Sequence, residues 1–204
     1  MNEDVIQHKY NVDTTQPNPI VVAHGGREEL VELWKELGYK VGLEVGVQRA
    51  EFAEYICSHF PGLKYYGVDS WTPYAGYTDI VASRHGQEAF DALYEVSKQK
   101  LAPYDATLIK NWSVEAAKGF DDESLDFVYI DGNHQFEFIT ADIAAWLPKV
   151  RKEGMLCGHD YARVNGHTLK IHVKDAVDGW TSSHGDKLFV YYKQRSPNWL
   201  FFKK

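Results

Sequence analysis

The 204-residue sequence contains only two cysteines, Cys57 and Cys157, and each stands inside an apolar stretch. Two separate cysteines cannot supply a Cys-x-x-Cys metal site or a disulfide framework, so we expect packed, reduced thiols in a cytoplasmic protein. The sequence also lacks an apolar run long enough to cross a bilayer, and residues 1–10 are too polar for a signal peptide. These absences predict a soluble protein with no membrane partner.

Positive charge is also scarce. The chain has 22 Lys and Arg against 29 Asp and Glu, which gives a net charge of −7. A nucleic-acid-binding surface needs an excess of basic residues, so we expect no nucleic-acid partner. A small-molecule substrate is the expected partner, and assembly into a homo-oligomer is left open.

Short apolar runs alternate with segments of helical periodicity. The runs predict strands at 41–46, 63–69, 106–110, 125–131 and 154–158, and the periodic segments predict helices at 29–37, 51–60, 87–101, 113–118, 134–150 and 169–180. Two further runs, 187–192 and 198–202, flank a polar turn and predict a β-hairpin. Strands that alternate with helices are typical of a parallel sheet covered on both faces. The sequence therefore predicts a Rossmann-like, doubly wound α/β domain over residues 26–204, preceded by an extended arm at 1–25.

Acidic side chains stand at or just after four of the five predicted strands. They are Glu44, Asp69, Asp131 and Asp160. Because the carboxyl ends of parallel strands meet at one edge of the sheet, and ligands of open α/β sheets bind beyond that edge, we expect a ligand site there.

The turn after the first predicted strand contains one glycine, Gly46. A dinucleotide-binding turn needs further glycines for the approach of a pyrophosphate, and Gln48 and Ala50 stand near those positions. This disfavours a nicotinamide or flavin cofactor, although an NAD-linked oxidoreductase stays an alternative. S-adenosylmethionine has no phosphate and does not need those glycines. A simple strand-to-helix turn is the alternative interpretation of Gly46.

Asp69 ends the second predicted strand and can accept hydrogen bonds from the two vicinal hydroxyls of a ribose. NAD and S-adenosylmethionine sites share this feature, so it indicates a ribose without choosing between them. Trp71 and Trp112 are candidates to stack on adenine, with a place in the core as the alternative for each.

Several motifs in the chain resemble the methyltransferase 24 family of class I methyltransferases. They are Ile130-Asp131-Gly132-Asn133-His134, Ala141-Asp142 with Ala145-Trp146, Gly158-His159-Asp160-Tyr161, and the earlier runs EVGVQRAEFAEYI and YYGVDSW. The resemblance covers roughly residues 41–180. One departure is the turn Lys152-Glu153-Gly154, where relatives often have a second glycine.

This resemblance implies an S-adenosylmethionine-dependent methyltransferase with a seven-stranded, mostly parallel sheet that ends in an antiparallel hairpin. It also implies a cofactor site. The expected cofactor-binding residues are Glu44, Gly46 and Val47 at the methionine part, Asp69, Ser70 and Trp71 at the ribose, Trp112 and Ser113 at adenine, and Asp131 at the methyl-donor region.

Methylation of a hydroxyl needs a base or a metal that lowers the hydroxyl pKa. His134, three positions after Asp131, is the candidate base. Alternatively, Asp131, His159 and Asp160 could bind Mg²⁺ or, because of the histidine, Mn²⁺. Helix capping is the structural alternative for His134 and for Asp160.

The acceptor expected from the resemblance is a hydroxyl of a sugar or other small molecule, with an amine or carboxylate left open. The aromatic segment Tyr74–His85 is long for a strand-to-helix connection and predicts a lid over the acceptor, with a surface loop as the alternative. A non-catalytic ligand-binding domain of the same fold is the second alternative function, because fold alone does not establish turnover.

Overall fold

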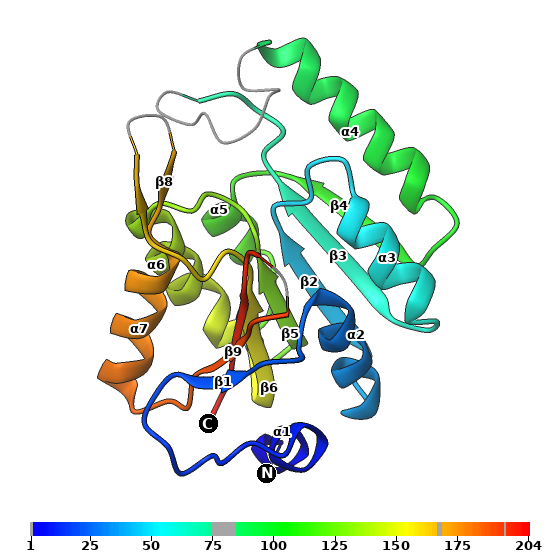
Figure 1. The fold of residues 1–204 in the computed structure, drawn as a ribbon. Helices are drawn as coiled ribbons and strands as arrows, with labels where there is room; N and C mark the ends of the chain where they lie inside the picture. Colours follow the sequence, from blue (N-terminus) through cyan, green and yellow to red (C-terminus); the bar gives the residue numbers. More distant parts are fainter. Residues whose placement is uncertain (1, 75–84, 167–168, 194) are drawn as a thin grey trace.

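The computed structural model describes residues 2–74, 85–166, 169–193 and 195–204 (Figure 1). An eight-stranded sheet forms its centre, in the order β1-β9-β10-β6-β5-β2-β3-β4. The strands are β1 (Ile20–Val22), β2 (Val41–Val45), β3 (Lys64–Asp69), β4 (Ala106–Lys110), β5 (Leu125–Ile130), β6 (Val150–Gly158), β9 (Phe189–Tyr191) and β10 (Asn198–Phe202). Only β10 runs against its neighbours, β6 and β9. The expected mostly parallel, Rossmann-like sheet with a C-terminal antiparallel hairpin is therefore confirmed.

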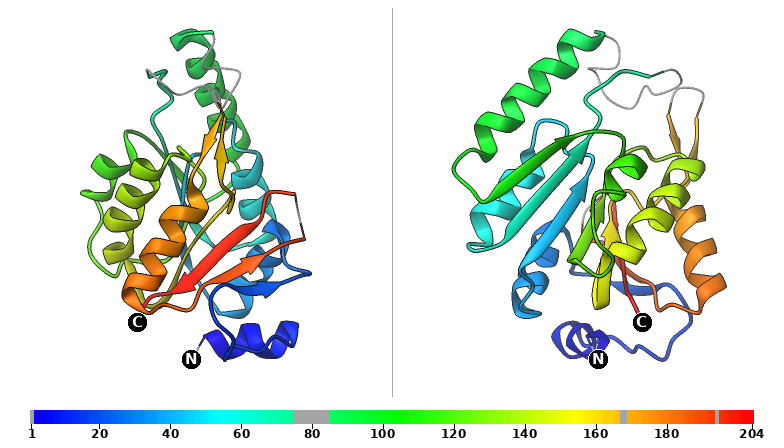
Figure 2. Two further views of the ribbon diagram at one scale, coloured as in Figure 1. Left: turned by 60° about the vertical axis from the view of Figure 1, so that its left-hand side comes forward. Right: turned by 180° about the vertical axis from the view of Figure 1, so that it is seen from behind.

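Helices cover both faces of this sheet, as Figure 2 shows. One layer contains α1 (Glu3–Tyr10), α2 (Arg27–Glu36), α3 (Glu51–His59) and α4 (Gln87–Leu101), and the other contains α5 (Ser113–Ala117), α6 (Phe136–Trp146), the 3₁₀ turn η2 (Leu147–Lys149) and α7 (Val173–His184). Side chains of β5 pack against both helical layers. Phe127 and Tyr129 belong to the apolar cluster on the side of the first layer, and Val128 and Ile130 to the cluster on the side of the second. This alternation explains why its sequence is apolar almost without interruption.

The N-terminal segment differs from the expected extended arm. Ile6 anchors α1 in the core and is fully buried. The three residues of β1 pair in parallel with β9, so the main sheet has eight strands where seven were expected. A polar helix with one buried anchor, and a strand of three residues, are too short for periodicity to reveal them.

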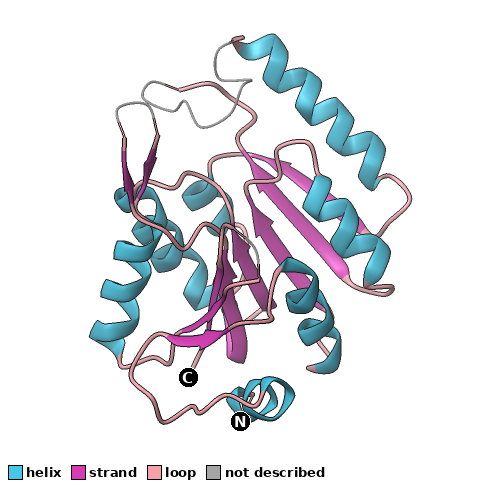
Figure 3. Cartoon of the chain, viewed as in Figure 1, coloured by secondary structure: helices cyan, strands magenta, loops and turns pink. Residues whose placement is uncertain are grey.

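A second, two-stranded sheet pairs β7 (Val164–Asn165) with β8 (Lys170–Ile171), as seen in Figure 3. It takes up the start of the segment predicted as a helix from residue 169, and α7 begins at Val173 instead. Both cysteines are free and buried, as expected. Within the described ranges, no helix combines the length and apolar character that a bilayer-crossing segment needs. Residues 75–84, most of the predicted lid, lie outside the described residues.

Candidate active site

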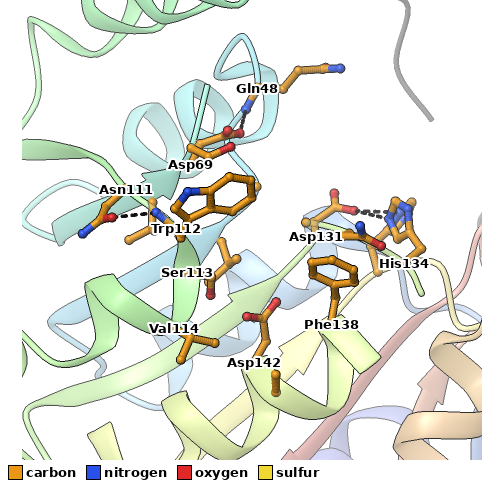
Figure 4. Close-up of a pocket in the computed structure, with 18 of the residues that line it drawn as sticks. Gln48, Asp69, Asn111, Trp112, Ser113, Val114, Asp131, His134, Phe138 and Asp142 are labelled. Carbon is orange, nitrogen blue, oxygen red and sulfur yellow. Dashed lines mark hydrogen bonds and ion pairs between the residues drawn. The ribbon is translucent and has the colours of Figure 1, made fainter. Parts of the chain in front are cut away.

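A cavity of about 480 Å³ lies beyond the carboxyl ends of β2, β3, β4 and β5 (Figure 4). Gly46, Asp69, Trp112 and Asp131 each bring one of the four strand-to-helix turns into its wall. The sheet order places β2 between β3 and β5, so the chain reverses its direction of progress across the sheet at β2. Ligands of open α/β sheets bind at such a switch point. The cavity has the size of a small-molecule site and the position that the strand ends predict.

Gly46 lies where the turn after β2 contacts the turn after β5. Its φ is +92°, and a Cβ at this position would lie 2.1 Å from the carbonyl oxygen of Asp131. Any side chain would push the two turns apart, in a backbone conformation that favours glycine. The close approach that requires a glycine is therefore between two segments of the protein itself, and Gly46 also lines the cavity.

Asp69 is held by backbone amides on both sides. Its Oδ2 accepts the Gln48 N–H at 2.9 Å, and its Oδ1 accepts the Trp71 N–H at 2.8 Å. Burial raises the pKa of the Asp69 carboxyl, while these amide hydrogen bonds oppose the increase. Each carboxylate oxygen can still accept a further hydrogen bond. The carboxylate is therefore oriented in the cavity wall and retains acceptor capacity for a ligand hydroxyl. Ser70, the next residue, also lines the cavity.

The two candidate stacking tryptophans lie in different environments. Trp112 lines the cavity, is 44% exposed, and contacts Tyr74 edge-to-face at 5.1 Å between ring centroids. Trp71 is fully buried against Tyr94, and its Nε1–H donates to the carbonyl of Gln48. The structure therefore makes Trp112 available to a planar ligand and places Trp71 in the core, which was the alternative for it.

Asp142 completes this side of the cavity, although the sequence motif around it suggested no role in the site. It lies on α6 among buried apolar residues, is 5% exposed, and lines the cavity beside Ser113. Burial raises the pKa of its carboxyl to about 7, against the lowering effect of a hydrogen bond with the Ser113 hydroxyl. Ser113 Oγ also accepts the Trp146 Nε1–H at 2.8 Å. An aspartate on the inward face of an apolar helix is the sequence signal that could have indicated it.

Glu44 and Val47 lie beneath the cavity; neither side chain is among the described residues that line it. Glu44 is 2% exposed, and its Oε2 accepts the Tyr65 hydroxyl at 2.5 Å. Burial raises its carboxyl pKa to about 8. Val47 is 4% exposed and packs in the apolar core. Their side chains support the turn that was expected to border the cofactor.

Two acids and two histidines meet where β5 and β6 end. His134 Nε2 lies 3.5 Å from Asp131 Oδ1 and 3.2 Å from Asp160 Oδ2. His159 Nδ1 lies 3.8 Å and 3.2 Å from the same two oxygens. Burial would raise the pKa of Asp160, but hydrogen bonds from His134 and His159 lower it well below its usual range. The three residues of the expected metal site are thus brought together, with His134 as a fourth.

This cluster has the composition of a cation site. One ligand atom each from Asp131, His134 and Asp160 lies within 4.8 Å of the other two. Carboxylate oxygens suit Mg²⁺, and the imidazole nitrogens shift the preference towards Mn²⁺ or similar ions. Helix capping does not explain these side chains, because Gln135 and His172 occupy the N-cap positions of α6 and α7.

Arg27 was not anticipated. It is the first residue of α2 and lines the cavity, and its Nη2 lies 2.5 Å from Asp131 Oδ2. The guanidinium also lies 5.0 Å from the ring centroid of Phe52 and 5.9 Å from that of Tyr129. Arg27 precedes every motif of the family resemblance, so no motif marked it.

Comparison of the structure with solved structures defines the class of fold. A protein assigned as a caffeoyl-CoA O-methyltransferase from Staphylococcus aureus matches with a TM-score of 0.65 and 11% identity, over 98% of this chain and 90% of that one. The cofactor-bound protein Rv0187 from MTB gives 0.64 and 11%, over 98% and 88%. A protein assigned as an O-methyltransferase from Klebsiella pneumoniae gives 0.61 and 12%, over 100% and 89%. The fold is that of class I methyltransferases.

The sequence comparison identifies the family. The model of the methyltransferase 24 family, described as a methyltransferase domain, matches residues 43–161. The chain therefore belongs to this family. A curated relative, the uncharacterized protein y4gI of Sinorhizobium fredii, is 22% identical over 121 residues, and the match spans 59% of this chain and 12% of that protein's length.

Proposed function

We propose that the protein transfers a methyl group from S-adenosylmethionine to a hydroxyl of a small molecule or sugar, with the help of a divalent cation. The observation that carries this proposal is the juxtaposition of two sets of groups in one cavity. Asp69 and Trp112 suit a nucleoside, and the Asp131, His134, His159 and Asp160 cluster suits a cation or an acid–base reaction.

The residues around the first turn fit this donor better than a dinucleotide. A pyrophosphate would need to approach the N-terminus of α3, where such ligands bind. The first turn of α3 carries Glu51 and Glu54, whose charges oppose a phosphate. Gln48 and Ala50 have left-handed φ angles of +53° and +58° in the turn where a dinucleotide site has glycines. These features disfavour the NAD-linked alternative.

Methyl transfer from this donor requires few chemical steps of the protein's own residues. When bound, S-adenosylmethionine supplies a methyl group on a positively charged sulfur, so no leaving group has to be protonated. The cavity walls have to align the acceptor hydroxyl with this methyl group and exclude water. The remaining task, removal of the hydroxyl proton, falls to the cluster at the ends of β5 and β6.

Asp131 and Asp160 are the proposed carboxylate ligands of a cation that lowers the pKa of the acceptor hydroxyl. His159, whose Nδ1 is 3.2 Å from Asp160, is the expected imidazole ligand. His134, whose Nε2 lies 3.2 Å from the same carboxylate, is then the candidate base for the hydroxyl proton. The close spacing of the two imidazoles around Asp160 also permits the reverse assignment, in which His134 binds the cation.

Calorimetry with S-adenosylmethionine, S-adenosylhomocysteine and NAD tests the donor. We expect the first two ligands to bind. Their affinity should fall roughly 10- to 100-fold in Asp69→Ala, because the ribose loses charge-assisted hydrogen bonds. Binding of NAD alone, or unchanged affinity for S-adenosylmethionine in the variant, contradicts the proposal.

Turnover separates the enzyme from a non-catalytic binding domain of the same fold. Candidate hydroxyl acceptors are screened for the formation of S-adenosylhomocysteine, with and without EDTA and with Mg²⁺ or Mn²⁺ restored. We expect EDTA and Asp160→Ala each to abolish methyl transfer while donor binding persists. Turnover that survives both treatments argues against a catalytic cation.

A further inference from the structure

We propose that Arg27 binds the α-carboxylate at the amino-acid end of the methyl donor. The inference rests on the proposed function and assigns a role to a residue outside the family-matched region, 43–161. Arg27 reaches the cavity from α2, and its ion pair with Asp131 places it beside the cluster of acids and histidines.

Arg27 is largely buried, which opposes its charge, but Tyr129, Asp131 and Glu44 raise the pKa of its guanidinium. It is the first residue of a ten-residue helix, where the helix dipole disfavours a cation. The Glu29 carboxylate accepts hydrogen bonds from the Gly26 and Glu29 amides at this N-terminus. The acids that follow, Glu28 and Glu29, pair with Lys193. This helix end therefore has its own anionic partner, and the attraction for a negatively charged ligand comes from the Arg27 guanidinium that lines the cavity.

The guanidinium of Arg27 has N–H donor capacity that its ion pair with Asp131 does not use. Its ion pair with Asp131 Oδ2 uses Nη2, while its Nε–H is buried and has no hydrogen-bond partner among the described residues. An arginine side chain has five N–H donors, arranged to grip a carboxylate through two of them. The aromatic rings of Phe52 and Tyr129, at 5.0 and 5.9 Å, hold the side chain in place.

The order of the strands matches the order of the groups in the donor. From one edge of the cavity to the other, the sheet runs β4, β3, β2, β5. These strands bring Trp112, Asp69, Gly46 and Asp131 to the cavity. A donor with adenine at Trp112 and ribose at Asp69 therefore extends its sulfur over Gly46 and its amino acid toward Asp131 and Arg27. Asp69 and Asp131 are two strands apart, roughly 10 Å, which an extended amino-acid side chain can span.

The amino-acid end of the methyl donor is a zwitterion, and the Arg27–Asp131 pair provides an oppositely charged partner for each of its two charges. When the carboxylate binds to Arg27, Asp131 Oδ2 becomes an acceptor for the neighbouring ammonium group. The ion pair that closes this part of the cavity is thereby exchanged for two ion pairs with the donor, and no charge is left unpaired.

The test compares two ligands that differ only at this end. S-adenosylhomocysteine carries the amino acid, and 5′-methylthioadenosine has the same nucleoside and thioether without it. By calorimetry we expect Arg27→Ala to weaken S-adenosylhomocysteine binding about 10- to 100-fold and to leave 5′-methylthioadenosine binding within about twofold. Arg27→Lys should give an intermediate loss, because the charge stays but the two-pronged geometry does not.

Arg49 provides the matched control. It is exposed and pairs with Glu51, so Arg49→Ala should leave the affinity for both ligands unchanged. Arg27→Met, which keeps the packing on Phe52, replaces Arg27→Ala if the alanine variant does not fold. Equal losses for the two ligands, or no loss for S-adenosylhomocysteine, would overturn the assignment. If the wild-type protein binds neither ligand, the proposed donor itself is wrong.

Discussion

Replacing Asp142 with asparagine should change how the stability of the protein depends on pH. The carboxyl is buried, and its pKa in the folded protein is raised to about 7 from an ordinary value of 3.8. The folded state therefore keeps a proton that the unfolded chain releases above pH 4. Stability supplied by the uncharged carboxyl is complete below about pH 4 and is lost as the pH rises to about 7.

The magnitude follows from the pKa difference. Each pH unit between the two pKa values costs the folded state about 1.4 kcal/mol, so from pH 5 to pH 7 the loss reaches about 3 kcal/mol and then levels off. An asparagine side chain at this position is close to the shape of the protonated carboxyl but does not ionise. We therefore expect the stability of Asp142→Asn relative to wild type to increase by about 3 kcal/mol between pH 5 and pH 8.

Urea unfolding followed by tryptophan fluorescence at pH 5, 6, 7 and 8 measures this difference. Comparison of wild type and variant at each pH removes the contributions of all other titrating groups. Parallel stability curves for the two proteins across this range would refute the reasoning, because they would show that Asp142 does not retain its proton on folding.

Three other substitutions test the site. Gly46→Ala should destabilise the protein by at least about 2 kcal/mol in thermal unfolding, and Gly62→Ala by only about 1 kcal/mol. Both glycines have a positive φ, but of the two only Gly46 would bring a Cβ against backbone atoms. Equal losses would show that the contact with Asp131 is unimportant. Trp112→Ala should weaken S-adenosylhomocysteine binding by about 5- to 100-fold in calorimetry if adenine stacks there; unchanged affinity would contradict the stacking. Glu44→Gln should stabilise the protein increasingly between pH 5 and 8, since burial raises the Glu44 pKa to about 8; a pH-independent effect in urea unfolding would contradict this.

The parts of the fold with a strong periodic pattern could be predicted from the sequence. The helix expected at 87–101 and the strand expected at 106–110 coincide with α4 and β4. The hairpin near Pro197 was also predicted and is formed by β9 and β10. The segments before residue 26 could not be predicted, because Ile6, Ile20 and Val22 are isolated anchors whose partners lie far away in the sequence.

The site was predictable where residues follow strand ends and much less so elsewhere. Asp69 and Asp131 come directly from such positions and line the cavity. Trp71 is buried in the core and has a left-handed backbone with a φ of +43°, which no sequence pattern revealed. Arg27 and Asp142 reach the cavity from helices, so their contribution depends on how those helices pack against the sheet.

The carboxylate of Asp131 divides its two oxygens between different neighbours. Oδ1 faces His134 and His159, and Oδ2 faces Arg27. If a cation occupies the first side and the donor the second, one side chain connects two ligands, and the occupancy of one changes the affinity for the other. Such a coupling is reciprocal: the factor by which the cation alters donor affinity must equal the factor by which the donor alters cation affinity.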